Sequence, residues 1–109
     1  MFKIVESVTF TRKVTAHVPD GDGQVPETFK ATFRSIPPEE ADEFNLLSTE
    51  GASEFLRRVV VRLDDIGDAQ GKPVDYSDEV RDQVIRLPWA RGALARTYFE
   101  EVRGAKLGN

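Results

Sequence analysis

From Val8 onward, apolar and polar residues alternate strictly, and this pattern leaves few folds open to the chain. The alternation runs to Val18 with only Arg12 out of place, and it resumes over residues 29–34. The apolar positions of the two runs are Val8, Phe10, Val14, Ala16, Val18, Phe29, Ala31 and Phe33. A period of two residues is typical of strands with one buried face. Residues 19–26 between the runs are rich in Pro, Gly and Asp, which predicts an exposed turn and an antiparallel hairpin.

The period changes to a helical one after Pro37 and Pro38. Apolar residues recur at helical spacing in a first segment (Ala41, Phe44, Leu47) and in a second one (Phe55, Leu56, Val59, Val60, Leu63). We interpret both segments as helices, although the β-branched run at residues 59–61 also fits a strand. The first helix would begin at the two prolines, and Ser48 to Gly51 would separate it from the second.

Two further helices are predicted in the last third of the chain. Ser77 is a suitable N-cap for the first of them, and Pro88 ends it and begins the next. Gly104 is a natural stop for the last helix. The first of these helices has Val80, Val84 and Leu87 at helical spacing. In the second, one side is formed by Ala90, Leu94, Thr97, Tyr98 and Val102.

The fold class expected from these elements is α+β, with an N-terminal antiparallel β-hairpin or small sheet packed against three or four short α-helices. A chain of 109 residues is long enough for one modest core, so residues 1–109 are predicted to form a single domain. Hydrophobic residues make up 39% of the chain and charged residues 31%, which is typical of a soluble globular protein.

Composition excludes several classes of protein. The chain has no cysteine, which rules out disulfides, thiolate zinc sites and cysteine nucleophiles. No stretch approaches the roughly 18 apolar residues of a membrane span, and the first residues do not resemble a signal peptide, so we expect a cytoplasmic protein without a membrane partner. A net charge of −4 without a clustered basic face argues against nucleic-acid binding.

The acidic stretch LDDIGDAQGKPVDYSDEV, residues 63–80, is the one segment that suggests a metal site. A calcium loop that began at Asp64 would need a ligand at its third position, Gly at its sixth and Glu at its twelfth. The chain has Ile66, Ala69 and Asp75 there. We therefore expect no metal site, and we interpret Asp68 to Gly71 as a tight turn.

Catalytic motifs are likewise missing. His17, the single histidine, falls on the polar side of the first strand, and no nucleophile elbow, zinc motif or phosphate-binding glycine loop occurs in the sequence. We therefore expect neither an enzyme nor a cofactor, and look instead for a surface that contacts other proteins.

The best candidates for such a surface lie on the last helix: Trp89, Arg91, Arg96, Tyr98 and Phe99. Trp and Arg are frequent in interface hot spots. For Trp89 we favour a place in the core over one in an interface, because few other large side chains are present to close a small core. Tyr98 and Phe99 are adjacent, so we expect that one of them cannot reach the core.

The order of these features resembles the tail assembly chaperones of long-tailed bacteriophages and prophages. The similarity lies in the second strand TFKATFRSIP, the turn DDIGDAQGKPVDYS and the end LPWARGALARTYFEEVRGAKLGN. Single marks are the Asp68/Gly71 turn, the Tyr76-Ser77 helix start, Pro88, the pair Tyr98-Phe99 and the terminal Asn109. One departure is Leu63, where many relatives carry Trp.

The resemblance implies a non-enzymatic protein. Such chaperones bind and solubilise the tape measure protein, help to recruit tail tube subunits, and are absent from the finished virion; self-association is expected with this role. A longer form made by a −1 ribosomal frameshift is common in the family. Leu107-Gly108-Asn109 can be encoded CUG-GGA-AAC, which contains a slippery heptamer, and we predict a frameshift there. The alternative is a minor tail or head–tail connector protein that stays in the particle.

Overall fold

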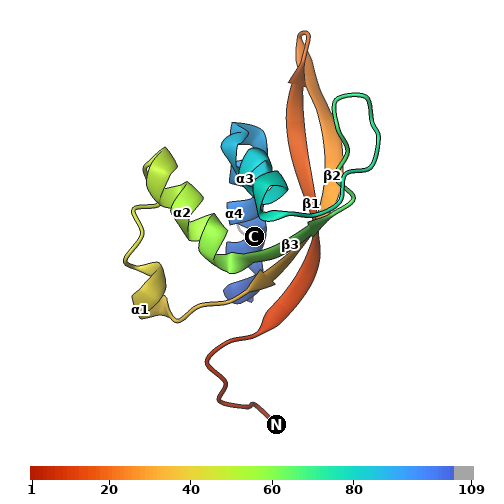
Figure 1. Ribbon diagram of the computed structural model, residues 1–109. Coiled ribbons are helices and arrows are strands. Elements are labelled where there is room, and N and C mark those ends of the chain that lie inside the picture. Colours follow the sequence, from red (N-terminus) through yellow and green to blue (C-terminus); the bar gives the residue numbers. More distant parts are fainter. Residues whose placement is uncertain (105–109) are drawn as a thin grey trace.

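A computed structural model gives the fold and describes residues 1–104 (Figure 1). Three strands form one antiparallel sheet in the order β1-β2-β3, and the helices pack on one of its faces. The elements are β1 (Thr9–Asp20), β2 (Gly23–Arg34), α1 (Pro38–Ala41), α2 (Thr49–Val59), β3 (Val60–Asp64), α3 (Asp78–Arg86) and α4 (Pro88–Val102). The predicted α+β class, with an N-terminal hairpin against helices, is confirmed.

The hairpin of β1 and β2 is longer than the sequence pattern indicates. Asp20 pairs with Gly23, so the turn has only two residues between the strands, and Gly21 adopts a positive φ of 58° there. The prediction that all of residues 19–26 form the turn is wrong, since Pro19 and Pro26 both lie inside strands. The upper end of this hairpin rises beyond the helices (Figure 1).

The alternation of hydrogen-bonded and non-hydrogen-bonded residue pairs along the hairpin explains how its strands accept Pro19 and Pro26. Ser35 N donates to Val8 O over 2.9 Å, which makes 8/35 a hydrogen-bonded pair. Successive pairs alternate in type, so 17/26 and 19/24 are non-hydrogen-bonded pairs. The nitrogens of Pro19 and Pro26 therefore point away from the partner strand, and no ladder hydrogen bond is lost.

Strand β3 carries a β-bulge that places two apolar side chains on the same face. Phe33 pairs with Val60 and Thr32 with Arg62, which leaves Val61 as an extra residue. Val60 and Leu63 are both buried, although they are three residues apart. The interpretation of residues 60–63 as helix is therefore wrong, since α2 ends at Val59 and the chain continues directly as strand.

Helix α1 is a single turn and stops well before the predicted end. Leu47 is fully exposed rather than part of an apolar stripe. Phe44 still reaches the core, where its ring meets that of Phe55 edge-on at 5.7 Å between centroids. The chain leaves helical geometry because Ser48 begins a new helix, with its Oγ accepting from Gly51 N at 2.9 Å.

Helices α3 and α4 follow one another with a break at Leu87. Ser77 caps α3 as predicted, since its Oγ accepts from Val80 N at 3.1 Å, and Gly104 follows α4 with a positive φ of 72°. The apolar face of α3 differs from the prediction, because Ile85 is buried while Leu87 is 41% exposed. Helix α4 packs against β1 and also touches α2 and α3.

The core lies between the sheet and helices α2 to α4. Its largest fully buried side chains are Phe33, Phe55, Leu56, Leu63, Ile85 and Leu94. The rings of Phe10, Phe33, Phe55 and Tyr98 form a chain of aromatic contacts through its centre. Within residues 1–104, no helix has the length and apolar character that a membrane crossing would need.

Candidate interaction surface

Tyr98 belongs to the core rather than to the surface. Only 2% of the residue is exposed, and its ring packs edge-on against Phe55 and Phe33 at centroid distances of 5.2 and 5.7 Å. Its hydroxyl accepts a hydrogen bond from the backbone N–H of Ile36 at 3.2 Å. This bond ties the end of β2 to α4, so Tyr98 positions the helix and does not offer a contact to a partner.

We expect Tyr98→Phe to lower the free energy of unfolding by about 1–2 kcal/mol, because it leaves the buried Ile36 N–H without an acceptor.

Burial raises the pKa of the Tyr98 hydroxyl above its ordinary value of 10.0, so folding favours the protonated form. The contribution of the protonated Tyr98 hydroxyl to stability is fully present below the ordinary pKa, and it is lost as the pH rises through the higher pKa of the folded state. Urea unfolding at about pH 7 and about pH 10.5 measures both effects, and wild type should lose more stability between them than the variant. Equal stability of the two proteins at neutral pH would contradict the assignment.

Phe99 lies at the edge of the core. Its ring stacks on that of Phe55 with centroids 5.2 Å apart and planes inclined by 7°. The guanidinium carbon of Arg103 lies 4.9 Å from the centroid of the Phe99 ring. Both Tyr98 and Phe99 thus touch the core, which corrects the expectation that one of them cannot reach it. Only Tyr98 is enclosed, and Phe99 remains accessible at one side.

Arg91 makes an internal contact between helices. Its Nη1 donates to the carbonyl oxygens of Ile85 at 3.1 Å and Arg86 at 3.2 Å. These carbonyls lie in the last turn of α3, where the helix leaves its acceptors unpaired, and a cation there is favourable. Arg91 therefore fixes the angle between α3 and α4 and is a structural residue.

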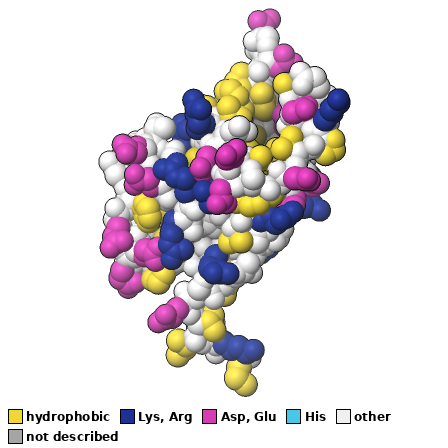
Figure 2. Space-filling view, viewed as in Figure 1, with side chains coloured by type: hydrophobic (Ala, Val, Ile, Leu, Met, Phe, Trp, Pro, Cys, Tyr) yellow, Lys and Arg dark blue, Asp and Glu magenta, His cyan; other side chains and the backbone are white. Residues whose placement is uncertain are grey.

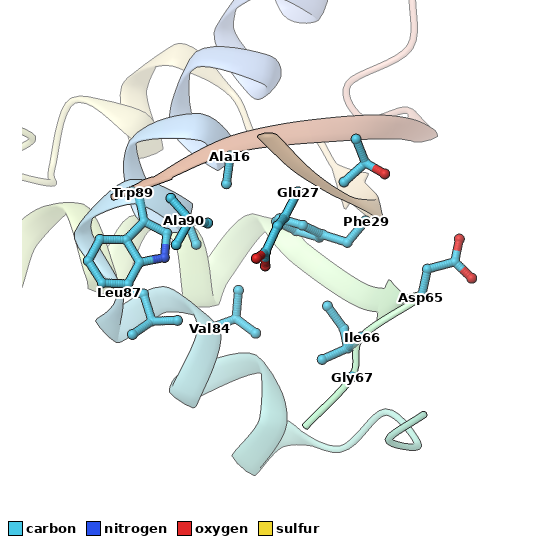
Figure 3. A pocket seen from close by; sticks show the side chains of 12 residues that line it. Ala16, Glu27, Phe29, Asp65, Ile66, Gly67, Val84, Leu87, Trp89 and Ala90 are labelled. Carbon is cyan, nitrogen blue, oxygen red and sulfur yellow. The ribbon is translucent and has the colours of Figure 1, made fainter. Parts of the chain in front are cut away.

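Trp89 lies at the surface, so the favoured place in the core is wrong. The residue is 36% exposed, and Leu87 just before it is 41% exposed. Trp89 stands at one end of an apolar groove of about 150 Å³. The groove lies between the hairpin near Val18 and Glu27, the segment after β3 and the start of α4. Figure 3 shows its ring at one end of the groove, Ile66 at the other, and the carboxylate of Glu27 pointing into the space between them. We call this hollow the tryptophan groove; its lining includes Val18, Glu27, Phe29, Ile66, Val84, Leu87 and Trp89.

Arg96 lies on the other side of Trp89. It lines a second hollow, of about 310 Å³, together with Thr15 and His17 from β1 and with Trp89 itself. Arg96 and His17 are both exposed. Of the five candidates, the structure therefore brings Trp89 and Arg96 together at one hollow beside β1. Phe99 lies near the end of α4 and lines a different hollow.

A third hollow lies at that other end and was not foreseen from the sequence. It has a volume of about 540 Å³ and lies between the start of β1, α1 and the end of α4. Val8 and Val102, which the sequence pattern places on the apolar sides of the first strand and the last helix, are 49% and 42% exposed here. The sequence pattern does not reveal this exposure. Periodicity shows which face of a strand or helix a residue lies on, but not whether another element covers that face. We call it the C-terminal groove; its lining includes Val8, Ile36, Ala41, Asp42, Phe99, Glu101, Val102 and Arg103.

The acidic stretch forms the predicted turn. Asp68 Oδ1 accepts from the backbone nitrogens of Gln70 and Lys72, both at 2.9 Å, and Gly71 has a positive φ of 81°. Gly71 N also donates to Asp68 O at 2.9 Å. The Asp68 carboxylate is thus engaged by the loop backbone. Residues 1–104 contain no group of three or more His, Cys, Asp or Glu side chains placed to hold a metal ion.

Comparisons with protein-family models, with curated proteins and with solved structures find no match for this chain. Leu107-Gly108-Asn109, where a frameshift is predicted, lie outside the described residues.

Proposed function

We propose that the protein is a tail assembly chaperone of a long-tailed phage or prophage, and that it binds apolar helical segments of the tape measure protein in the tryptophan groove. The observation that carries the proposal is the groove itself, an apolar channel closed at one end by a partly exposed Trp89. Trp is among the residues that most often anchor a protein–protein contact, and the exposed Leu87 side chain extends the apolar surface beside it.

The chemistry of the groove indicates which helix would fit. Its walls are apolar at Val18, Val84 and Leu87, which suits the apolar face of an amphipathic helix. The Glu27 carboxylate in the middle would attract a Lys or Arg of that helix, and Asp65 adds a second negative charge at the same groove. The preferred segment would therefore carry apolar residues at helical spacing with one basic residue among them.

In this role the protein would act in the cytoplasm of the host, in many copies along one tape measure chain. Coverage of apolar helices would keep them from aggregating until tube subunits assemble around them. The protein would then leave, and it would be absent from the finished virion. It would have no catalytic activity and no cofactor.

We expect Trp89→Ala to weaken binding of a tape measure fragment about tenfold, since removal of a partly buried Trp from an interface commonly costs more than about 1 kcal/mol. Leu87→Ser should act in the same direction. Val61→Ala is the matched control, because Val61 is 43% exposed on β3, away from the groove. Titration of the purified fragment by calorimetry or fluorescence measures all three variants.

Two further experiments bear on the assignment. Co-expression should raise the soluble yield of the tape measure protein, and an unchanged yield would contradict the chaperone role. Mass spectrometry of purified particles should find no stoichiometric amount of the protein; its recovery there would favour a minor tail or head–tail connector protein. The codons of residues 107–109 in the gene test the frameshift.

A further inference from the structure

Residues 1–6 form an arm that leaves the body with its apolar side chains in solvent. Figure 1 shows this arm extending from the start of β1, and Figure 2 shows hydrophobic side chains gathered on it. The exposed fractions are 112% for Met1, 94% for Phe2, 96% for Ile4 and 59% for Val5. So many large apolar groups on one short segment are costly in water and mark a contact with something else.

The exit of the arm is fixed by hydrogen bonds around Ser35. Ser7 Oγ donates to Ser35 O at 2.8 Å, and Val8 N donates to Ser35 Oγ at 3.0 Å. Ser35 N donates back to Val8 O at 2.9 Å. These three bonds continue the direction of β1 past its end, so the arm points away from its own body (Figure 1).

The C-terminal groove lies at the same end of the molecule. Its walls are largely apolar, and no residue of 1–7 lines it. It therefore offers an apolar channel that the chain's own arm does not fill. The volume of about 540 Å³ is in the range of sites that hold several side chains.

We propose that the arm of one copy docks in the C-terminal groove of a second copy. In an extended chain, Phe2 and Ile4 project from the same side about 7 Å apart, which gives two apolar anchors for one groove. The charges also match. Lys3 would lie near Asp42 and Glu101 at the rim of the groove, and Glu6 near Arg103.

The arrangement has a definite symmetry. The arm and the groove are different surfaces, so each copy donates one arm and accepts another, and the contact is head-to-tail. Such a contact closes into a ring or continues as a filament. It does not depend on the proposed binding of the tape measure protein, because the tryptophan groove takes no part in it.

Light scattering after gel filtration tests the proposal with full-length protein. Wild type should show a mass that rises with concentration above the 12.2 kDa of one chain. The double variant Phe2→Ser/Ile4→Ser and the groove variant Val102→Lys should each stay at the mass of one chain. Leu47→Ser is the matched control, since Leu47 is equally exposed but lies outside the C-terminal groove, and it should behave as wild type. Circular dichroism confirms that all variants are folded.

A mixing experiment separates docking between arm and groove from any other contact. The double variant keeps an intact groove, and Val102→Lys keeps an intact arm, so an equimolar mixture should form a dimer of twice the chain mass and stop there. A mixture that stays monomeric while wild type assembles would overturn the proposal. Wild type that is monomeric at every concentration would also overturn it, as would an arm variant that assembles like wild type.

Discussion

Phe55→Ala is expected to lower the free energy of unfolding by about 3–5 kcal/mol, the usual cost of removal of a fully buried phenyl ring. Phe55 is completely buried, and its ring contacts those of Phe44, Tyr98 and Phe99. A cavity at this position would loosen α4 and the segment after α1 together. Because a domain of this size is stable by only about 5–15 kcal/mol, the midpoint of thermal unfolding should fall by about 15 °C or more.

Two comparison variants sharpen this experiment. Phe55→Leu keeps most of the volume and should cost much less than the alanine variant. Leu47→Ala removes an apolar side chain that is fully exposed, and it should change stability by less than about 0.5 kcal/mol. Urea unfolding gives the three values, and a loss below about 1 kcal/mol for Phe55→Ala would show that Phe55 is not at the centre of the core.

Gly51→Ala is expected to destabilise the protein by about 2 kcal/mol or more, although alanine is the better helix former. A Cβ atom at Gly51 would clash with the backbone carbonyl of Asn45, whose carbon would be only 2.7 Å away. It would also lie 2.9 Å from Ser48 Oγ, which caps α2. Backbone cannot rotate out of the way as a flexible side chain can, so the loop before α2 would have to move and the cap would be lost.

The matched control for this change is another helical glycine, Gly92 in α4. A Cβ atom there meets no atom within 4 Å, so Gly92→Ala should stabilise the protein by up to about 1 kcal/mol. Opposite signs for the two glycines in denaturant unfolding are the expected result. Stabilisation by both substitutions would mean that the loop at Asn45 does not pack against α2 in this way.

The strands of the hairpin could be predicted because each has one buried face and a plain period of two. Strand β3 could not, because its bulge sets Val60 and Leu63 three residues apart on the same face. A spacing of three is also what a helix produces, so the local pattern favours the wrong element. Pairing with Phe33 and Ala31 of β2 decides the conformation, and that contact joins segments about thirty residues apart.

The candidate surface was only partly predictable for a related reason. The sequence draws attention to α4, but it does not show which of its side chains are used inside the fold. Tyr98 is held by the backbone of Ile36, and Arg91 by carbonyls of α3, and both contacts depend on how the elements assemble. The grooves themselves lie between elements that are distant in the sequence, so no local pattern could reveal them.

Pro19 and Pro26 protect the hairpin against pairing of its open edges with strands of other molecules. The end of the hairpin that carries the turn extends beyond β3, because β3 pairs with β2 only from Lys30 to Phe33. Both strands of the hairpin therefore have open edges there. An open edge usually invites a strand from another molecule and is a starting point for aggregation. Pro26 on the β2 edge and Pro19 on the β1 edge each present a nitrogen without a hydrogen, which interrupts any continuous ladder that an incoming strand would form. The tip of the hairpin can therefore stand free in a crowded solution without seeding a larger sheet.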